Sequence, residues 1–390
     1  MQILYGFSNC TDSKYNEIMK DVKIAVLRPD QKYHGLLIRG LAENGARVKC
    51  FSGLPINRAV TKKILISEKD ECENGISYHY YKTLNLPVLR HIMIFFGALT
   101  NILKAKKEED TFAICDCLNI ANAYGMALSC KIRKIPLISI VTDLPDMLTD
   151  NKLLRFINNR LFKKFDGFIL LTKQMNDRIN MKNKPFIVLE GHVDSKAKSL
   201  EPAAKYEETD GRKVIIYAGG IRKKYGIKEL AEGFLLADIE FGELHIYGDG
   251  DFREGIKKIA ENNESIKYMG VCANDTVVRE ELKAALLVNP RPTDGEYTKY
   301  SFPSKNMEYM VSGTPLLAAK LPGMPDEYLP YIYLIEEETP RGISKTLSEI
   351  FSKTREEREE KGKCAREFVL ANKSNTAQAK RIIVFLKNNY

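Results

Sequence analysis

Three polar side chains in the last quarter of the chain have the spacing of a phosphate and ribose site. Ser304, Lys305 and Glu308 follow Pro303, which disfavours helical geometry in the residue before it. We expect a short helix here, with Ser304 as its N-cap. A helix N-terminus favours an anion, and a carboxylate one turn further along can accept hydrogen bonds from ribose hydroxyls. The run 300–310 therefore predicts a nucleotide site, although the same residues could simply cap a helix.

Glycine and proline mark four further strand ends in the second half. The apolar runs 213–218, 243–247, 266–269 and 284–289 predict buried strands, and they end at Gly219, Gly248, Gly270 and Pro290. Glycine lets a backbone approach a ligand closely. Basic residues, among them Arg222, Lys223 and Arg291, follow two of these ends, so we expect one ligand-binding edge.

The elements that must position these residues alternate between strands and helices. In the first half, the apolar runs 3–7, 47–51, 112–116, 136–142 and 167–171 predict strands, and 33–42, 121–131 and 153–165 predict helices. A further apolar run covers 22–27. Such alternation is typical of doubly wound parallel sheets, whose ligands bind beyond the carboxyl ends of the strands. Asp116 and Asp143 follow two of these ends, and Asp143 is either a site residue or a helix cap.

Composition narrows the class of protein. The eight cysteines form no C-x-x-C pair, which favours a reducing cytoplasm, and the five histidines show no ligand spacing, so we expect no metal. Residues 1–200 hold 31 Lys and Arg against 20 Asp and Glu. This basic half predicts an anionic partner, such as a lipid-linked diphosphate or a peripheral contact with an anionic membrane. We see no nucleic-acid-binding module and expect no nucleic acid partner.

The apolar segment 86–103 has two interpretations. Its uninterrupted part, 92–99, is far shorter than the ~20 residues that a membrane span needs. It predicts either a buried domain helix or an amphipathic helix that lies against lipid. We also see no signal peptide at the N-terminus, and we expect a cytoplasmic protein, which could lie at the inner face of the membrane.

Several motifs, in this order, resemble glycosyltransferase family 4, which has the GT-B fold. The matching segments are Val141-Thr142-Asp143, Gly191-His192-Val193-Asp194, Tyr217-Ala218-Gly219-Gly220 through Tyr225-Gly226, Gly248-Asp249-Gly250, Gly270-Val271, Phe302-Pro303-Ser304-Lys305 through Glu308-Tyr309-Met310, and Ser312-Gly313-Thr314-Pro315. Three positions depart from the family pattern. Tyr300 stands where the family has a glutamate that touches the donor sugar, Gly220 replaces an arginine, and Tyr225 replaces a lysine.

The resemblance implies an α/β protein with two Rossmann-like doubly wound domains facing a cleft. We expect an acceptor-binding domain at 1–195, a linker rich in charged residues at 196–212, a nucleotide-sugar-binding domain at 213–374, and a final helix at 375–390 that crosses back to the first domain. Glu308 would bind the ribose, Lys305 and Arg222 the diphosphate, and the backbone of Val271 and Cys272 the base.

The expected function is transfer of a sugar from a UDP- or GDP-sugar to a lipid-linked or polysaccharide acceptor. The resemblance implies retention of configuration, no metal and no cofactor, in the synthesis of a cell-surface polysaccharide. A nucleotide-sugar 2-epimerase and a non-catalytic nucleotide-sugar-binding subunit stay open as alternatives. The predicted catalytic residue is Asp143, and the predicted donor-binding residues are Gly219, Gly220, Arg222, Lys223, Gly248, Val271, Cys272, Arg291, Tyr300, Ser301, Phe302, Pro303, Ser304, Lys305 and Glu308.

Overall fold

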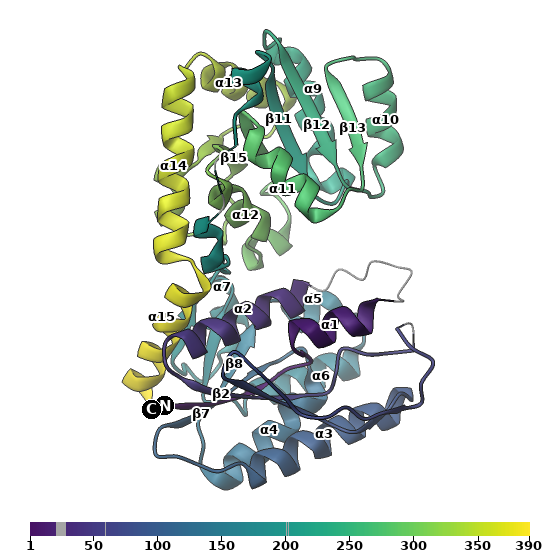
Figure 1. The fold of residues 1–390 in the computed structure, drawn as a ribbon, viewed down its shortest axis with the longest axis vertical. Helices are drawn as coiled ribbons and strands as arrows, with labels where there is room; N and C mark the ends of the chain where they lie inside the picture. The colour runs from purple at the N-terminus through teal and green to yellow at the C-terminus, as the bar shows by residue number, and fades with distance from the viewer. Residues whose placement is uncertain (21–28, 59, 200, 202) are drawn as a thin grey trace. The chain divides into compact units, whose positions relative to one another are not determined.

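The computed structural model describes residues 1–20, 29–58, 60–199, 201 and 203–390. The predicted apolar run 22–27 lies outside these residues. The chain forms two compact units (Figure 1). The first unit consists of Met1–His192 and Asn375–Tyr390, and the second consists of Val193–Ser374. Each unit is built on its own β-sheet, and we describe the two separately.

The first unit contains an eight-stranded sheet in the order β10-β9-β8-β7-β1-β2-β5-β4. Its central strand β1 (Gln2–Gly6) is buried along its whole length and pairs in parallel with β2 and β7, as expected of a strand covered on both faces. Only β4 pairs antiparallel, at one edge of the sheet. The other strands are β2 (Arg47–Ser52), β4 (Glu71–Glu73), β5 (Ile76–Tyr80), β7 (Thr111–Asp116), β8 (Leu137–Val141), β9 (Gly167–Leu170) and β10 (Phe186–Val188), with a separate pair, β3 (Leu65–Ile66) and β6 (Thr83–Leu84).

Helices cover both faces of this sheet. The core formed by Ile3 and Tyr5 includes Leu37 of α2 and Ile382 of α15 on one face. On the opposite face, a Cβ added to Gly6 would lie 1.9 Å from the sulfur of Met126 in α4. Figure 1 shows α2 on one side of this sheet and α3 and α4 on the other. The helices of the unit are α1 (Asp12–Met19), α2 (Pro29–Glu43), α3 (Pro87–Lys104), α4 (Ile120–Arg133), α5 (Pro145–Leu148), α6 (Lys152–Phe162), α7 (Gln174–Ile179) and α15 (Asn375–Asn389).

The second unit contains a six-stranded sheet in the order β13-β12-β11-β14-β15-β16. All its strand pairs are parallel, so the carboxyl ends of the strands lie along one edge. The strands are β11 (Lys213–Ala218), β12 (Gly242–Tyr247), β13 (Ile266–Gly270), β14 (Leu286–Asn289), β15 (Leu316–Ala319) and β16 (Tyr333–Ile335). The α-helices are α8 (Tyr206–Thr209), α9 (Ile227–Ala237), α10 (Arg253–Glu261), α11 (Asn274–Lys283), α12 (Ser304–Ser312), α13 (Pro340–Phe351) and α14 (Arg355–Asn372), and the 3-10 turns are η1 (Ser195–Ser199), η2 (Lys223–Tyr225), η3 (Glu296–Tyr300) and η4 (Asp326–Tyr331).

The segment 196–212, which we predicted to be a linker, belongs to the second unit. Its charged side chains are anchored there. Glu207 accepts two hydrogen bonds, at 2.6 and 2.8 Å, from the buried guanidinium of Arg358 in α14. Lys205 donates to the carbonyl of Leu282 and the hydroxyl of Thr314, both at 2.8 Å, and burial lowers its pKa to about 8. The low apolar content therefore reflects polar anchoring, which composition alone does not distinguish from a linker.

The final helix, α15, belongs to the first unit and packs on α2. Asn375 at its start donates to the carbonyl of Leu36 at 3.1 Å, and a Cβ added to Gly40 would lie 2.3 Å from the carbonyl oxygen of Asn375. The close approach of the two helices therefore depends on a glycine. Across the described parts of the chain, the structure contains no helix with the length and apolar character needed to cross a bilayer.

Candidate functional site

The helix α12 begins one residue earlier than an N-capping Ser304 would require. Pro303 occupies the N-cap position, Ser304 is the first helical residue, and no side chain caps the helix. The backbone N–H of Asn306 donates to the carbonyl of Pro303 at 3.0 Å. The helix ends at Gly313, whose φ of 79° is the left-handed geometry that favours glycine. The amino end of α12 therefore lacks the side-chain cap that we expected, because its serine lies inside the helix.

Two polar contacts fix α12 against the carboxyl ends of two strands. The buried hydroxyl of Tyr309 donates to the carbonyl of Ala218 at 3.1 Å and accepts from the N–H of the same residue at 2.8 Å. Asn289, the last residue of β14, donates to the side-chain oxygen of Asn306 at 2.6 Å. Ala218 immediately precedes Gly219, so these contacts hold α12 beside the predicted diphosphate loop.

The ammonium group of Lys305 is paired with acidic side chains, which the sequence did not indicate. Its ammonium group lies 2.9 Å from the carboxylate of Glu308 and 3.9 Å from that of Glu281, a buried residue of α11. Burial lowers the pKa of Lys305, but the two carboxylates outweigh it, so the net shift is upward. Two carboxylates surround one ammonium group, which gives the first turn of α12 no positive excess from its side chains.

The predicted glycine turns meet at one edge of the second sheet. The N–H of Gly248 donates to the carbonyl of Gly270 at 2.8 Å, and the N–H of Gly219 donates to the carbonyl of Tyr247 at 3.1 Å. Gly248 has a φ of 128°, and a Cβ there would lie 1.9 Å from the carbonyl oxygen of Gly219. Any larger residue would push the two turns apart. The structure thus brings Gly219, Gly220 and Gly248 together, as parallel strands require.

Three cations gather around two tyrosine rings beside this edge. Arg291 lies 4.4 Å from the ring centre of Tyr225 and 5.9 Å from that of Tyr297. Lys224 lies 5.7 and 5.2 Å from the same two rings, and Arg222 lies 5.8 Å from Tyr225. Within the part of the chain that the structure describes, no ion pair joins Arg222, Lys224 or Arg291 to an acidic side chain. We call these five residues the cation–tyrosine cluster.

The charges around this cluster act on the hydroxyl of Tyr297. Burial raises the pKa of Tyr297, the charge of Arg291 opposes that rise, and the carboxylate of Asp294 adds to it. Tyr217 connects the cluster to the loop, because its hydroxyl donates to the carbonyl of Gly220 at 2.9 Å. Sequence reasoning placed Arg222 and Arg291 in the donor site. It named Tyr225 only as a departure from the family pattern, and it did not include Lys224 or Tyr297 among the site residues. The sequence feature that could have indicated this cluster is a tyrosine a few residues after the basic residues of each turn.

The remaining predicted donor residues have mixed environments. Val271 is 76% exposed, and the thiol of Cys272 lies 3.6 Å from the carbonyl of Met269. The side chain of Lys223 takes no part in the cation–tyrosine cluster, and its backbone N–H donates to Asp251 at 3.0 Å.

The loop before α12 is anchored in the core of the second unit. Phe302 is buried, with its ring 5.0 Å from that of Tyr328. Tyr300 ends the turn η3. The hydroxyl of Ser301 is buried without a hydrogen-bond partner among the described residues. Phe302 therefore stabilises the loop by packing in the core, independently of any ligand that the loop binds.

In the first unit, Asp143 follows β8 and lies near Asp116, which ends β7. Surrounding protein atoms displace water from one side of the exposed Asp143, which raises the pKa of its carboxyl group. The charge of Asp116 adds to the rise, and a hydrogen bond with Thr142 opposes it. Because Asp143 is exposed, its carboxyl group is accessible to a ligand at this edge.

The carboxylate of Asp116 is already hydrogen-bonded within the first unit. It accepts from the N–H of Leu118 at 2.6 Å, and it lies 3.1 Å from the ring nitrogen Nε2 of His34, whose Nδ1 is 2.6 Å from the hydroxyl of Tyr5. All of Tyr5, His34 and Asp116 are buried. The sequence placed His34 in the predicted helix 33–42 and gave the residue no role. Its contact with Asp116 could not be predicted from the positions of the two residues in the sequence.

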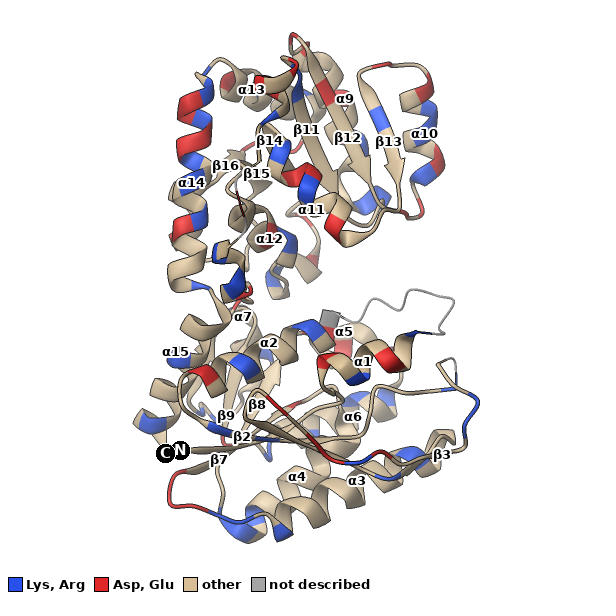
Figure 2. Ribbon diagram, viewed as in Figure 1, with Lys and Arg blue, Asp and Glu red and all other residues tan. Residues whose placement is uncertain are grey.

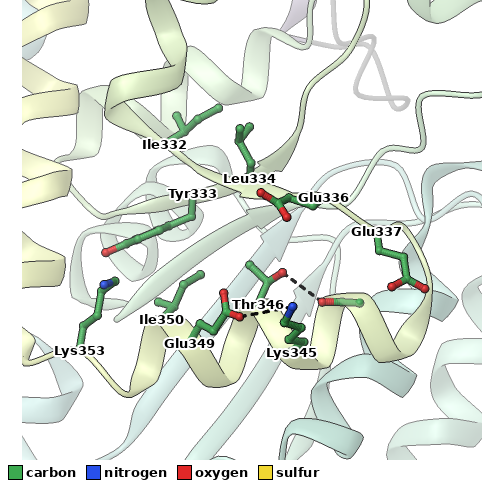
Figure 3. Close-up of a pocket in the computed structure, with 11 residues that line it drawn as sticks. Ile332, Tyr333, Leu334, Glu336, Glu337, Lys345, Thr346, Glu349, Ile350 and Lys353 are labelled. Carbon is green, nitrogen blue, oxygen red and sulfur yellow. Dashed lines mark hydrogen bonds and ion pairs between the residues drawn. The ribbon is translucent and has the colours of Figure 1, made fainter.

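Two further observations concern other parts of the molecule. A surface hollow of about 330 Å³ lies between β16 and α13, and none of the predicted site residues lines it (Figure 3). Among the described residues, no group of three or more His, Cys, Asp or Glu side chains is arranged to hold a metal ion.

Comparisons with known proteins agree with this architecture. Residues 201–368 match the family model described as Glycosyl transferases group 1. Comparison with curated protein sequences gives no match. Sucrose-phosphate synthase from Thermosynechococcus elongatus is similar in structure, with a TM-score of 0.66 and 15% identity over 100% of this chain and 98% of that chain. Alr3699/HepE from Anabaena, solved with UDP, has a TM-score of 0.65 and 12% identity over 100% of both chains.

A third similar structure is the lipopolysaccharide outer core galactosyltransferase WaaB, with a TM-score of 0.63 and 15% identity over 100% of both chains. Identities this low show the fold alone. The chain therefore has the α/β fold of the GT-B glycosyltransferases, with two Rossmann-like domains, and its residues 201–368 match the group 1 glycosyl transferases.

Proposed function

We propose that this protein is a glycosyltransferase that uses a nucleotide-sugar donor and transfers the sugar to a hydroxyl group of a lipid-linked or saccharide acceptor. Transfer would proceed with retention of configuration and without a metal ion, as the resemblance to glycosyltransferase family 4 implies. The match of residues 201–368 to group 1 glycosyl transferases supports sugar transfer. WaaB, a lipopolysaccharide galactosyltransferase with the same fold, supports a role in cell-surface polysaccharide synthesis.

The observation that carries this proposal is the cation–tyrosine cluster. Arg222, Lys224 and Arg291 have no ion-pair partner among the described residues, and they lie beside the glycine turns at the carboxyl ends of parallel strands. Cations at such an edge are placed to hold a diphosphate, and arginine can contact it through two N–H groups. The same charges would stabilise the negative charge that develops as the diphosphate leaves the sugar.

The predicted donor residues of the second unit divide among the parts of a nucleotide-sugar. We assign Glu308 to the ribose hydroxyls and the turn after β13, with Val271 and Cys272, to the base. We assign Arg222 and Arg291 to the diphosphate. Tyr225 stands where the family has a lysine, and Arg291 places its guanidinium against that ring. We propose that Arg291 supplies the positive charge that the family's lysine provides at the position of Tyr225.

Asp143 is the proposed catalytic residue of the acceptor-binding unit. Its carboxylate could orient an acceptor hydroxyl or offset the positive charge that develops on the sugar in an oxocarbenium-like transition state. Asp116, its neighbour, is held by His34 and Leu118, which leaves Asp143 as the better candidate of the two.

The experiment is a donor panel with a lipid-linked acceptor, analysed for transfer, hydrolysis and epimerisation. UDP-sugars come first because the structure of Alr3699/HepE, which has the same fold, contains UDP. We expect transfer that persists with a chelator and falls at least tenfold in Arg291→Ala, the equivalent of about 1.4 kcal/mol. The matched control is Arg341→Ala, an exposed arginine of α13.

Three results would overturn the proposal. An epimer formed from the donor alone would identify a 2-epimerase. Donor binding without turnover on any acceptor in the panel would identify a binding subunit. Equal activity of the Arg291→Ala and Arg341→Ala variants would remove the diphosphate role of the cation–tyrosine cluster.

A further inference from the structure

One face of the first unit exposes an unusual concentration of large apolar side chains. Of the 21 large hydrophobic residues that are exposed in the described chain, ten belong to α3, α4 and α6. On α3 they are spaced four residues apart, with Val88 70%, Ile92 45% and Phe96 54% exposed. Residues at this spacing lie on one side of a helix, so they form a continuous stripe.

The neighbouring helices extend this stripe into a surface. On α4, Leu128 and Ile132 are 44% and 60% exposed, and on α6, Leu153 and Phe156 are 65% and 54% exposed. Leu128 and Ile132 are also four residues apart, and Leu153 and Phe156 are three apart, which places each pair on one side of its helix.

Hydrogen bonds show that the three helices lie side by side. The guanidinium of Arg133 in α4 donates to the carbonyl of Ile102 in α3 at 2.7 Å. The hydroxyl of Tyr124 in α4 donates to the carbonyl of Ile157 in α6 at 2.8 Å. The outward sides of α3, α4 and α6 therefore form one layer, which we call the α3–α4–α6 face.

The charges on this face have a single sign. The helices α3, α4 and α6 together contain seven Lys and Arg residues and no Asp or Glu. One of the seven, Arg155, lies 3.1 Å from Asp150, which precedes α6. Figure 2 shows basic residues on α6 and near the ends of α3 and α4. One of them, Arg160, places its guanidinium 4.6 Å from the ring centre of Phe156, so apolar and basic groups are interleaved.

We propose that the α3–α4–α6 face docks on the surface of an anionic phospholipid bilayer. Apolar side chains would enter the headgroup region while Lys and Arg contact the lipid phosphates, the arrangement of interfacial amphipathic helices. Basic residues near such a surface are attracted to the negative potential of its anionic lipids. A second copy of this chain fits less well, because a symmetric contact would bring the same basic patches together without a counter-charge.

The test is flotation of the full chain with vesicles, with no sugar donor present. One set of vesicles contains phosphatidylcholine alone, and the other contains phosphatidylcholine with phosphatidylglycerol. We expect binding to the anionic vesicles that weakens as salt is added, because salt screens the charges. Because no donor is used, this result is independent of the proposed transferase activity.

Variants separate the apolar and the charged contributions. The Phe96→Ser/Phe156→Ser variant should bind at least tenfold more weakly, because it removes two aromatic rings that would enter the headgroup region. Phe241→Ser, which alters a 69% exposed phenylalanine of the second unit, is the matched control. Lys131→Glu/Arg160→Glu should also lose binding, whereas Lys345→Glu on α13 should not.

Three outcomes would overturn the proposal. The first is equal binding to both kinds of vesicle. The second is wild-type binding by the Phe96→Ser/Phe156→Ser variant. The third is a concentration-dependent dimer, seen by sedimentation equilibrium, that the same variant abolishes, because this result would assign the face to a second copy of the chain. Circular dichroism of each variant verifies that the loss of binding does not come from unfolding.

Discussion

The ammonium group of Lys305 and the carboxylate of Glu308 form an ion pair at 2.9 Å in the first turn of α12. Both residues were expected to contact the donor, one through the diphosphate and the other through the ribose. In the structure the two charges neutralise each other, and Glu281 adds a second carboxylate at 3.9 Å from the same ammonium group. Donor binding would therefore require Glu308 to exchange part of this contact for ribose hydroxyls.

The Glu308→Gln variant tests that exchange. We expect it to bind a nucleoside diphosphate roughly 10- to 100-fold more weakly, because hydrogen bonds to a charged group contribute about 1.5–3 kcal/mol. Inorganic diphosphate should bind no more weakly than to the wild type, since Lys305 loses one of its carboxylate partners. Titration calorimetry with both ligands measures the difference. Equal losses for both ligands would contradict a ribose role for Glu308.

The hydroxyl of Tyr309 tests how α12 is held. Tyr309→Phe removes both hydrogen bonds to the backbone of Ala218 and leaves a buried N–H and a buried carbonyl without this partner. We expect the free energy of unfolding to fall by about 1–3 kcal/mol, measured by urea denaturation. Tyr331→Phe is the control, because no hydrogen bond from that hydroxyl is found among the described residues. Equal stability of the two variants would show that this contact does not anchor the helix.

Gly248 tests the close approach of the glycine turns. Gly248→Ala should lose nucleotide binding and more stability than Gly270→Ala, because its Cβ would lie 1.9 Å from the carbonyl oxygen of Gly219. Gly270 also has a positive φ, of 71°, but a Cβ there would lie in open space. The Gly270→Ala variant therefore measures the cost of the backbone geometry alone. That cost is about 1–3 kcal/mol. Thermal unfolding and nucleotide titration of both variants measure the comparison, and equal losses would refute the packing role.

Asp143 should show opposite effects on stability and activity. Partial burial raises the pKa of its carboxyl group in the folded protein above the ordinary value of 3.8, so the folded state holds this proton more tightly than the unfolded state does. Ionised Asp143 therefore destabilises the fold at neutral pH, and this cost disappears as the pH falls below 3.8.

We expect Asp143→Asn to melt at a higher temperature than the wild type at pH 7 and to lose this advantage in acid. Its transfer activity should be lost, and wild-type kcat/KM should fall as the pH drops through the raised pKa. Calorimetry and transfer assays over a pH series measure both effects. Asp177→Asn, on the exposed side of α7, is the control. A variant that stays active, or that is less stable at pH 7, would contradict the assignment.

Periodicity and turn chemistry were sufficient to predict the two parallel sheets. The buried strands 213–218 and 3–7 appear as β11 and β1, within a residue or two. The helix near Ser304 was predicted because Pro303 and Gly313 mark its two ends. In the structure these residues are the N-cap and the C-cap of α12. Local signals of this kind lie within a few residues of each other, which is why sequence reasoning detects them.

Contacts between residues far apart in the chain could not be predicted from the sequence. Nothing near Lys305 signalled Glu281, which comes 24 positions earlier and meets it only because α11 and α12 pack together. The contact of His34 with Asp116 joins residues 82 positions apart. The anchoring of 196–212 to α14 was missed for the same reason, since a run of charged residues indicates a linker until the partner of Glu207 is known.

The measurement that tests the central claim most directly is calorimetric titration of the full chain with UDP and GDP. The claim is that cations at the carboxyl edge of the second sheet hold the diphosphate of a nucleotide donor. We predict saturable binding of at least one of the two nucleotides, weakened at least tenfold, or about 1.4 kcal/mol, in Arg291→Ala and unchanged in Arg341→Ala. Absence of binding by either nucleotide, or equal affinity in both variants, would contradict it.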